Sequence, residues 1–160
     1  MGTAKLLDPH NVEVTSEGAG KLILNSAHVI IAPGAQPKIF PNLELVKEKV
    51  WTYFEAMVPK AIPKTILVIG SGAIGVEFAS FYCALGSNVT IVEMLPNILP
   101  NEDHEISAIA RKKMEDRGIK IITDAKITEL SGAEKKVKAF IEQQNGEIIT
   151  IEVEKIISAI

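Results

Sequence analysis

Residues 66–75 read Ile66-Leu67-Val68-Ile69-Gly70-Ser71-Gly72-Ala73-Ile74-Gly75, an apolar run that leads directly into a glycine-rich turn. The apolar run predicts a short parallel strand that is buried on both faces, because no polar residue interrupts it. The glycines have the spacing G-x-G-x-x-G, which permits a tight turn and a close approach of the backbone to a pyrophosphate. The residues up to Leu85 predict a helix, and Gly86 supplies its end. This order of strand, turn and helix is the setting in which the glycine spacing indicates dinucleotide binding.

A second apolar run, Val89–Val92, ends at Glu93, roughly 20 positions after the first glycine. A carboxylate at that place accepts hydrogen bonds from an adenosine ribose and repels a 2′-phosphate. The pattern therefore favours NAD(H) over NADP(H). S-adenosylmethionine and flavin nucleotides also bind to similar glycine turns, and from the residues alone both stay open as alternatives.

Apolar spacing predicts which faces of the two helices are buried. In the helix after the glycine turn, the residues at steps of four, three and four are expected to form the apolar face. In a second helix, capped by Asn101 or Asp103 and running to Arg117, a similar set is expected to face inward. The first set is Ile74, Phe78, Phe81 and Leu85, and the second is Ile106, Ile109, Ala110 and Met114.

The remaining apolar runs complete an α/β fold class. A strand at Ile119–Ile122 gives a Rossmann-like parallel sheet of β-α-β-α-β order. Shorter strands follow, two of them joined by a turn at Asn145-Gly146, and they predict an antiparallel β-meander. These strands are Ile127–Leu130, Val137–Glu142 and Glu147–Glu154, and Lys155–Ile160 is expected as a final strand.

The first part of the chain is expected to be a short β-rich segment followed by a linker. Strands are predicted at Val12–Val14, Leu22–Leu24 and Val29–Ala32, after which prolines recur. Residues 42–58 have partial helical spacing, with Thr52 as a candidate cap of a short helix that ends before Pro59. We therefore place a domain boundary near residue 60, with residues 1–59 before it and residues 60–160 as the nucleotide-binding domain.

Composition excludes several classes of function. The 160 residues carry a formal net charge of −3, which gives no electrostatic footprint for nucleic acid. No apolar run approaches the length of about 20 residues that spans a bilayer, and no signal-like segment begins the chain, so we expect a cytoplasmic protein without a membrane partner. The single cysteine, Cys83, is interpreted as a packed residue. The acids around His104 suit the start of a helix better than a metal site.

The glycine turn and the strands around it resemble the pyridine nucleotide-disulfide oxidoreductases, and within that family the dihydrolipoamide dehydrogenases. The most specific residues are Ile69–Phe78, Leu85–Ser87 and Val89–Glu93, and the resemblance extends from about Gly2 to Ile160. It implies a flavoprotein that passes electrons from dihydrolipoamide through a redox-active disulfide and FAD to NAD. It also implies NAD(H), the other domains of a longer enzyme and a 2-oxo acid dehydrogenase complex as partners.

The resemblance also assigns roles to residues. Glu77 is expected to reach the nicotinamide carboxamide, Ile74 to lie near the nicotinamide and the flavin, and the main chain of Ile127 to contact adenine. Pro33-Gly34-Ala35 matches a segment that borders FAD, although Pro33 stands where the family has threonine. Neither a catalytic residue nor a metal ligand is expected in this chain. The full set of expected cofactor-binding residues is Gly70, Ser71, Gly72, Ala73, Ile74, Gly75, Glu77, Glu93, Ile127, Pro33, Gly34 and Ala35.

Several family features are not found in these residues. They are the FAD fingerprint with its redox cysteine pair, the Gly-Arg motif expected after Ser158-Ala159-Ile160, and the C-terminal dimerisation domain with its His-Glu pair. We therefore expect the central portion of a longer enzyme, in which residues 1–59 are a β-rich remnant of the FAD domain with its linker and residues 60–160 are the NAD-binding domain. It should bind dinucleotide but be inactive alone. The NAD-binding portion of a related flavin disulfide reductase, such as mercuric reductase, or of a soluble transhydrogenase stays open, as does a non-catalytic dinucleotide-sensing module.

Overall fold

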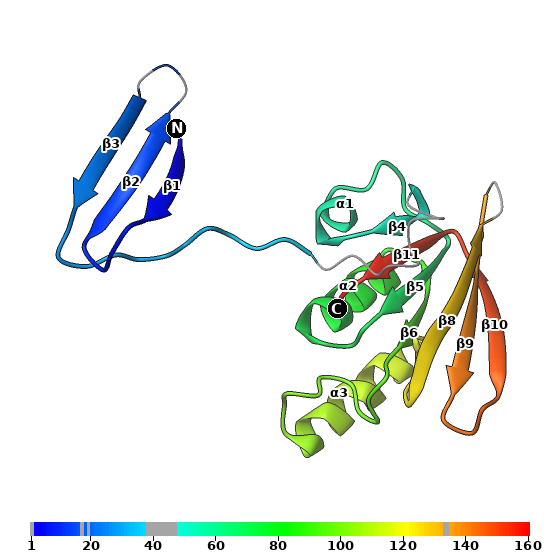
Figure 1. The fold of residues 1–160 in the computed structure, drawn as a ribbon. Coiled ribbons are helices and arrows are strands. Elements are labelled where there is room, and N and C mark those ends of the chain that lie inside the picture. Colours follow the sequence, from blue (N-terminus) through cyan, green and yellow to red (C-terminus); the bar gives the residue numbers. More distant parts are fainter. Residues whose placement is uncertain (1, 17, 19, 38–47, 133–134) are drawn as a thin grey trace. The chain divides into compact units, whose positions relative to one another are not determined.

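The computed structural model describes residues 2–16, 18, 20–37, 48–132 and 135–160, and it divides into two compact units. The first unit comprises residues 1–36, and the second comprises residues 37–160. The elements of both are labelled in Figure 1. In the described part of the chain, no helix combines the length and the apolar character that crossing a membrane requires.

The first unit is a three-stranded antiparallel sheet of order β1-β2-β3. Strand β2 (Asn11–Ser16) and strand β3 (Gly20–Asn25) confirm the two predicted strands, and β1 (Thr3–Leu6) is an additional one. The strand predicted at Val29–Ala32 is wrong. Ile30 and Ile31 are 91% and 73% exposed and belong to a segment without strand structure. An apolar run becomes a strand only where a neighbouring strand pairs with it, and in the described residues none does.

The second unit is built on a five-stranded parallel sheet of order β4-β11-β5-β6-β7. The strands are β4 (Val50–Trp51), β5 (Thr65–Ile69), β6 (Asn88–Val92), β7 (Lys120–Ile122) and β11 (Lys155–Ser158). Strand β11 therefore lies between β4 and β5, beside the strand that leads into the glycine turn (Figure 1).

Helices and a second sheet cover the two faces of the parallel sheet. The helices are α1 (Tyr53–Met57), α2 (Ala73–Ala84) and α3 (His104–Asp116). The antiparallel meander has the order β10-β9-β8 and consists of β8 (Ala125–Gly132), β9 (Val137–Gln143) and β10 (Ile148–Val153). The predicted α/β class, with a parallel sheet and an antiparallel meander, is confirmed.

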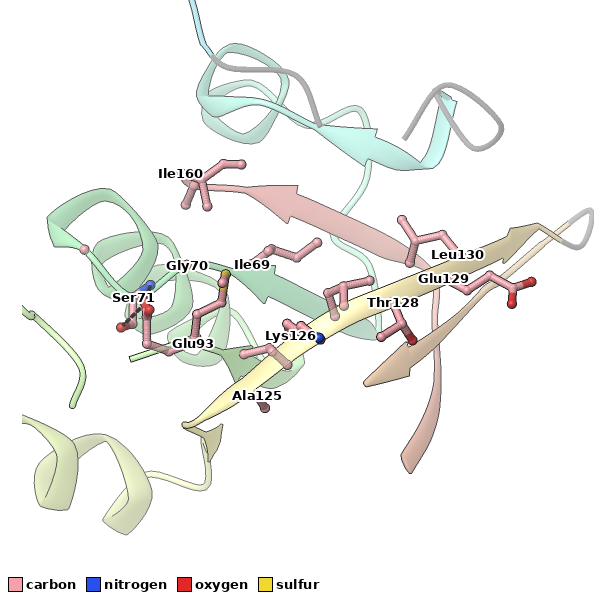
Figure 2. Close-up of a pocket in the computed structure, with 15 residues that line it drawn as sticks. Ile69, Gly70, Ser71, Glu93, Ala125, Lys126, Thr128, Glu129, Leu130 and Ile160 are labelled. Carbon is pink, nitrogen blue, oxygen red and sulfur yellow. Dashed lines mark hydrogen bonds between the residues drawn. The ribbon is translucent and has the colours of Figure 1, made fainter. Parts of the chain in front are cut away.

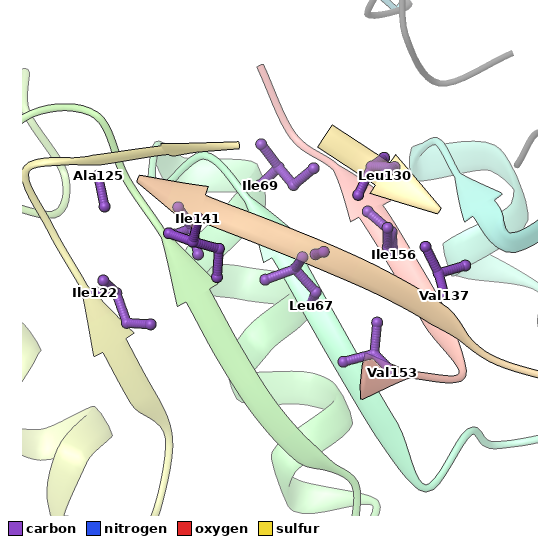
Figure 3. Packing of buried hydrophobic residues seen from close by; sticks show 11 residues of the cluster. Leu67, Ile69, Ile122, Ala125, Leu130, Val137, Ile141, Val153 and Ile156 are labelled. Carbon is purple, nitrogen blue, oxygen red and sulfur yellow. The ribbon is translucent and has the colours of Figure 1, made fainter. Parts of the chain in front are cut away.

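Alternating residues of β5 point to these two layers. Leu67 and Ile69 belong to the cluster shared with the meander (Figure 3), whereas Ile66 and Val68 belong to the cluster shared with the helices. All four are less than 10% exposed, as expected for a parallel strand with both faces covered. The buried strand fixes where the glycine turn begins.

The predicted buried face of α2 is wrong for most of its residues. Ile74, Phe81 and Leu85 are each nearly half exposed, while Gly75, Ala79 and Tyr82 are buried. Small residues at Gly75 and Ala79 let the helix lie close to the sheet, and this closeness turns the larger neighbours outward. In helix α3, Met114 is buried as predicted, but Ile106 and Ile109 are more than half exposed and Ser107 is buried in their place.

The ends of the helices agree with the capping predictions. Thr52 caps α1 together with Glu55, Asp103 caps α3, and Gly86 ends α2 with φ of 91°. Of the helical spacing predicted over residues 42–58, residues 42–47 lie outside the described residues, and Val50–Trp51 forms strand β4 instead. Strand β4 and helix α1 precede residue 60 but pack within the second unit of this chain.

Candidate dinucleotide-binding site

A cavity of about 390 Å³ lies at the carboxyl ends of β5, β6 and β11, beside β8 (Figure 2). Ligands of open parallel sheets bind in the crevice outside the carboxyl ends of the strands. The cavity is lined by Ile69, Gly70, Ser71, Gly72, Val92, Glu93, Met94, Ala125, Lys126, Ile127, Thr128, Glu129, Leu130, Ala159 and Ile160.

The three glycines of the turn meet different constraints. Gly70 has φ of 96°, and a Cβ there would lie 2.5 Å from the carbonyl oxygen of Ala159. A Cβ on Gly75 would collide with the carbonyl oxygen of Gly70, so this glycine permits the close packing of α2. A Cβ on Gly72, in contrast, would meet nothing within 4 Å. Packing within the chain thus explains Gly70 and Gly75, whereas Gly72 leaves open space where a ligand can approach the backbone.

Helix α2 presents its N-terminus beside this turn. Gly72 is the N-cap and supplies no side-chain hydrogen bond, and the first turn contains no acidic residue. The first N–H groups of a helix have no partner within the helix, and the helix dipole places partial positive charge there. The backbone at Gly72 and Ala73 can therefore hold an anionic phosphate.

Glu93 follows β6 and lines the same cavity, although its side chain is only 9% exposed. Its Oε2 accepts hydrogen bonds from the Ser71 N–H at 2.8 Å and the Ser71 hydroxyl at 2.7 Å (Figure 2). Its Oε1 accepts one from the Leu95 N–H at 3.0 Å. The ion pairs formed among the described residues do not include Glu93. Within that part of the chain, neutral N–H and O–H donors hold this carboxylate beside the cavity.

Strand β8 forms the opposite wall. Ile127 is half-buried and lines the cavity, and the register between β8 and β9 shifts directly after it. A bulge of this kind re-aims the backbone of a strand. Ile127 thus borders the cavity at the point where the pairing of β8 becomes irregular.

The structure brings together only part of the predicted site. Gly70, Ser71, Gly72, Glu93 and Ile127 all line the cavity. The remaining predicted residues of α2 belong to its first turns and do not line it, and the three residues of the FAD-bordering segment are exposed and belong to the first unit. The former are Ala73, Ile74, Gly75 and Glu77, and the latter are Pro33, Gly34 and Ala35.

Sequence reasoning missed the cavity residues contributed by β11 and the loop after β6. Ala159 and Ile160 reach the site because β11 pairs with β5, a neighbour relation that no local pattern shows. Met94 follows Glu93 directly and could have been inferred from that position. No group of three or more histidine, cysteine, aspartate or glutamate residues in the described ranges is arranged to hold a metal ion.

Known proteins similar to this chain are dihydrolipoyl dehydrogenases. Dihydrolipoyl dehydrogenase of Rhizobium etli is 47% identical over 141 residues, which cover 88% of this chain and 29% of that protein. The enzyme of the same name from Zymomonas mobilis is 46% identical over 134 residues, covering 84% of this chain and 28% of that protein. The chain thus spans less than a third of the length of these relatives.

Solved structures also match nearly the whole of this chain. LpdA from Mycobacterium tuberculosis superposes with a TM-score of 0.81 at 25% identity, covering 99% of this chain and 35% of that one. The HOCl-induced flavoprotein disulfide reductase RclA from Escherichia coli gives a TM-score of 0.76 at 28% identity, covering 99% and 34%. The family model described as pyridine nucleotide-disulphide oxidoreductase matches residues 1–160. This chain belongs to the pyridine nucleotide-disulphide oxidoreductase family.

Proposed function

We propose that this chain carries the NAD(H)-binding site of a dihydrolipoyl dehydrogenase. The observation that supports the proposal most strongly is the cleft in which the glycine turn and the buried Glu93 face one cavity at the carboxyl ends of parallel strands. A phosphate-holding backbone and a ribose-reading acid at this edge are the two parts that a dinucleotide needs. The family's own description, a pyridine nucleotide-disulphide oxidoreductase, supports NAD(H) over S-adenosylmethionine.

Different residues are assigned to the pyrophosphate, the ribose, the adenine and the nicotinamide of the ligand. The backbone at Gly72 and Ala73, where α2 begins, holds the pyrophosphate, and Glu93 accepts a hydrogen bond from the adenosine ribose. The adenine lies against β8 at Ile127. Glu77 and Ile74, which are exposed on α2, are assigned to the nicotinamide half, where they would meet the ligand beyond the cavity.

The activity of the whole enzyme is proposed from the relatives. The longer protein would oxidise dihydrolipoamide through a redox disulfide and FAD, serve a 2-oxo acid dehydrogenase complex, and act in the cytoplasm. NAD supplies the acceptor for the hydride in that reaction. Pro33-Gly34-Ala35 would border FAD there. This polypeptide contains neither a cysteine pair nor a second glycine fingerprint, so we expect it to bind NADH without turnover.

A second candidate is the same domain of a different flavoprotein disulfide reductase. It is favoured by the similarity to RclA, which extends over 99% of this chain. The substrate that donates electrons distinguishes the two, and its site lies outside these residues. Both candidates predict the same dinucleotide site.

The test is a calorimetric titration of the chain with NADH and with NADPH, with Glu93→Ala as the variant. We expect an NADH dissociation constant of about 0.1–1 mM, which corresponds to roughly 4–5.5 kcal/mol, because only the adenosine and pyrophosphate segments are held here. The preference for NADH should disappear in Glu93→Ala. A folded chain that binds neither dinucleotide would contradict the proposal.

A further inference from the structure

The carboxylate of Glu93 is already largely occupied before any ligand binds. A carboxylate has about four lone-pair positions, and three donors reach Glu93. Two of these donors, the N–H and the hydroxyl of Ser71, share Oε2, and the third, the Leu95 N–H, binds Oε1. A ligand that leaves these bonds intact therefore finds one acceptor position on Glu93, and that position is on Oε1.

Burial and a further hydrogen bond restrict the movement of Ser71. Its side chain is fully buried, and its carbonyl oxygen accepts a hydrogen bond of 2.8 Å from the Leu99 N–H. Leu99 has a positive φ of 49°, and its carbonyl oxygen accepts a hydrogen bond of 3.2 Å from the hydroxyl of the buried Ser107. The loop between β6 and α3 thus holds Ser71 through its carbonyl oxygen, while Glu93 accepts from its N–H and its hydroxyl.

We propose that Ser71 is a positioning residue for cofactor selectivity: its hydroxyl orients the Glu93 carboxylate so that Oε1 meets a ribose hydroxyl and stands against a 2′-phosphate. The inference rests on the proposed NAD(H) site. It assigns a role to the variable residue between the first two glycines, a position that the glycine spacing leaves unspecified. If the Ser71 hydroxyl is removed, Oε2 of Glu93 accepts from only one donor, the Ser71 N–H, and the carboxylate can turn away from the ribose.

The variant Ser71→Ala tests this role because the two dinucleotides should respond in opposite ways. We expect NADH binding to weaken by about threefold to tenfold, since the carboxylate is no longer held in place. NADPH binding should stay unchanged or tighten, because the repelling carboxylate can move away. An equal loss for both dinucleotides, or an unchanged NADH-to-NADPH ratio, would overturn the inference.

Ser87→Ala is the matched control. It removes the same atom from a buried serine whose hydroxyl donates to the Pro63 carbonyl oxygen and not to Glu93. It should leave the ratio of the two affinities as in the unchanged chain. In a Glu93→Ala background, Ser71→Ala should have no further effect on that ratio, because the group that it orients is gone.

Hydrogen exchange separates this inference from the proposed function. The Leu95 amide, bound to Glu93 Oε1, should exchange at least about threefold faster in Ser71→Ala than in Ser87→Ala. If the unchanged chain binds neither dinucleotide, the proposed function fails, and this exchange rate still decides whether Ser71 orients Glu93. Equal exchange in the two variants would refute the orienting role.

Discussion

The glycines of the turn differ in the reason why a side chain is excluded at each position. Gly75 is needed for packing, because a Cβ there would collide with the Gly70 carbonyl oxygen, whereas Gly72 borders open space. The spacing G-x-G-x-x-G indicates that a side chain is excluded at all three glycines. It does not show whether the chain itself or a bound ligand excludes the side chain. That distinction depends on the distance between α2 and the turn, which only the folded chain defines.

Alanine at Gly75 should therefore reduce mainly the stability of the fold, and alanine at Gly72 should reduce mainly the affinity for NADH. Gly75→Ala should lower the free energy of unfolding by about 1–3 kcal/mol through overpacking. Gly72→Ala should cost under about 1 kcal/mol, mainly for the poorer N-cap, but should weaken NADH binding by at least about tenfold. Urea unfolding and calorimetric titration of both variants measure the two quantities. Equal loss of stability in both variants would contradict the assignment.

Glu93 shows what a motif predicts at the scale of one residue and what it leaves out. The acid predicted after the second strand, Glu93, lies in the cavity with the glycine turn. Its hydrogen bonds to Ser71 were not predicted, because residues 22 positions apart come together only when β5 and β6 pair. Motif spacing indicates the chemistry of a position but does not show its partners.

At the level of elements, the helices show the limit of hydrophobic periodicity. The large residues Phe81 and Leu85 were predicted to be buried on α2, and the structure buries Gly75 and Ala79 instead. Periodicity weighs residues by hydrophobicity, so a helix that packs through small residues is assigned the wrong face. Strand β4 was missed for a related reason, since its two residues become a strand only by pairing with β11.

A buried hydrogen bond joins helix α1 to helix α2. The hydroxyl of Tyr82 donates a hydrogen bond of 2.6 Å to the carbonyl oxygen of Ala56, and both residues are fully buried. Tyr82→Phe should lower the free energy of unfolding by about 1–3 kcal/mol, because it leaves the Ala56 carbonyl without this donor. Denaturant unfolding near neutral pH measures this loss. A variant as stable as the unchanged chain would show that the contact is dispensable.

The same contact predicts a dependence on pH. Burial raises the pKa of Tyr82 above its ordinary value of 10.0, because desolvation disfavours the phenolate. The folded chain then holds this proton more tightly than the unfolded chain does, so the contribution to stability is complete below about pH 10 and is lost as pH rises further. The stability difference between the unchanged chain and Tyr82→Phe should stay constant from pH 7 to 9 and shrink above about 10. A difference that grows with pH would contradict this sign.

At the level of the whole molecule, the two units differ in how much they bury. The residues of β1 and β3 are exposed throughout, whereas β5 is buried at four of its five positions. A small sheet without a covered face is marginally stable in water. Amides of residues 3–25 should therefore exchange with solvent much faster than those of β5, in a ratio of at least about a hundredfold. Equal protection, measured by hydrogen exchange with NMR detection, would mean that the first unit is covered in solution.

The overall architecture was predictable only in part. Alternating strand and helix signals predicted the parallel sheet and the meander, because each is a local pattern of apolar residues. The position of β11 between β4 and β5 was not predictable, since strand order depends on contacts between distant segments. That position brings Ala159 and Ile160 to the cavity, and the sequence alone therefore predicted only part of the cavity lining.

The most direct test of the central claim is an NMR titration of the isotopically labelled chain with NADH. Dinucleotide bound in the cleft should shift the amide signals of Gly70, Ser71, Gly72 and Ile127, while the signals of Lys112 and Lys113, which are exposed on α3 and do not line the cavity, should stay in place. Shifts that leave the glycine turn unchanged, or that gather on other surfaces of the chain, would contradict the assignment of this cleft as the NAD(H) site.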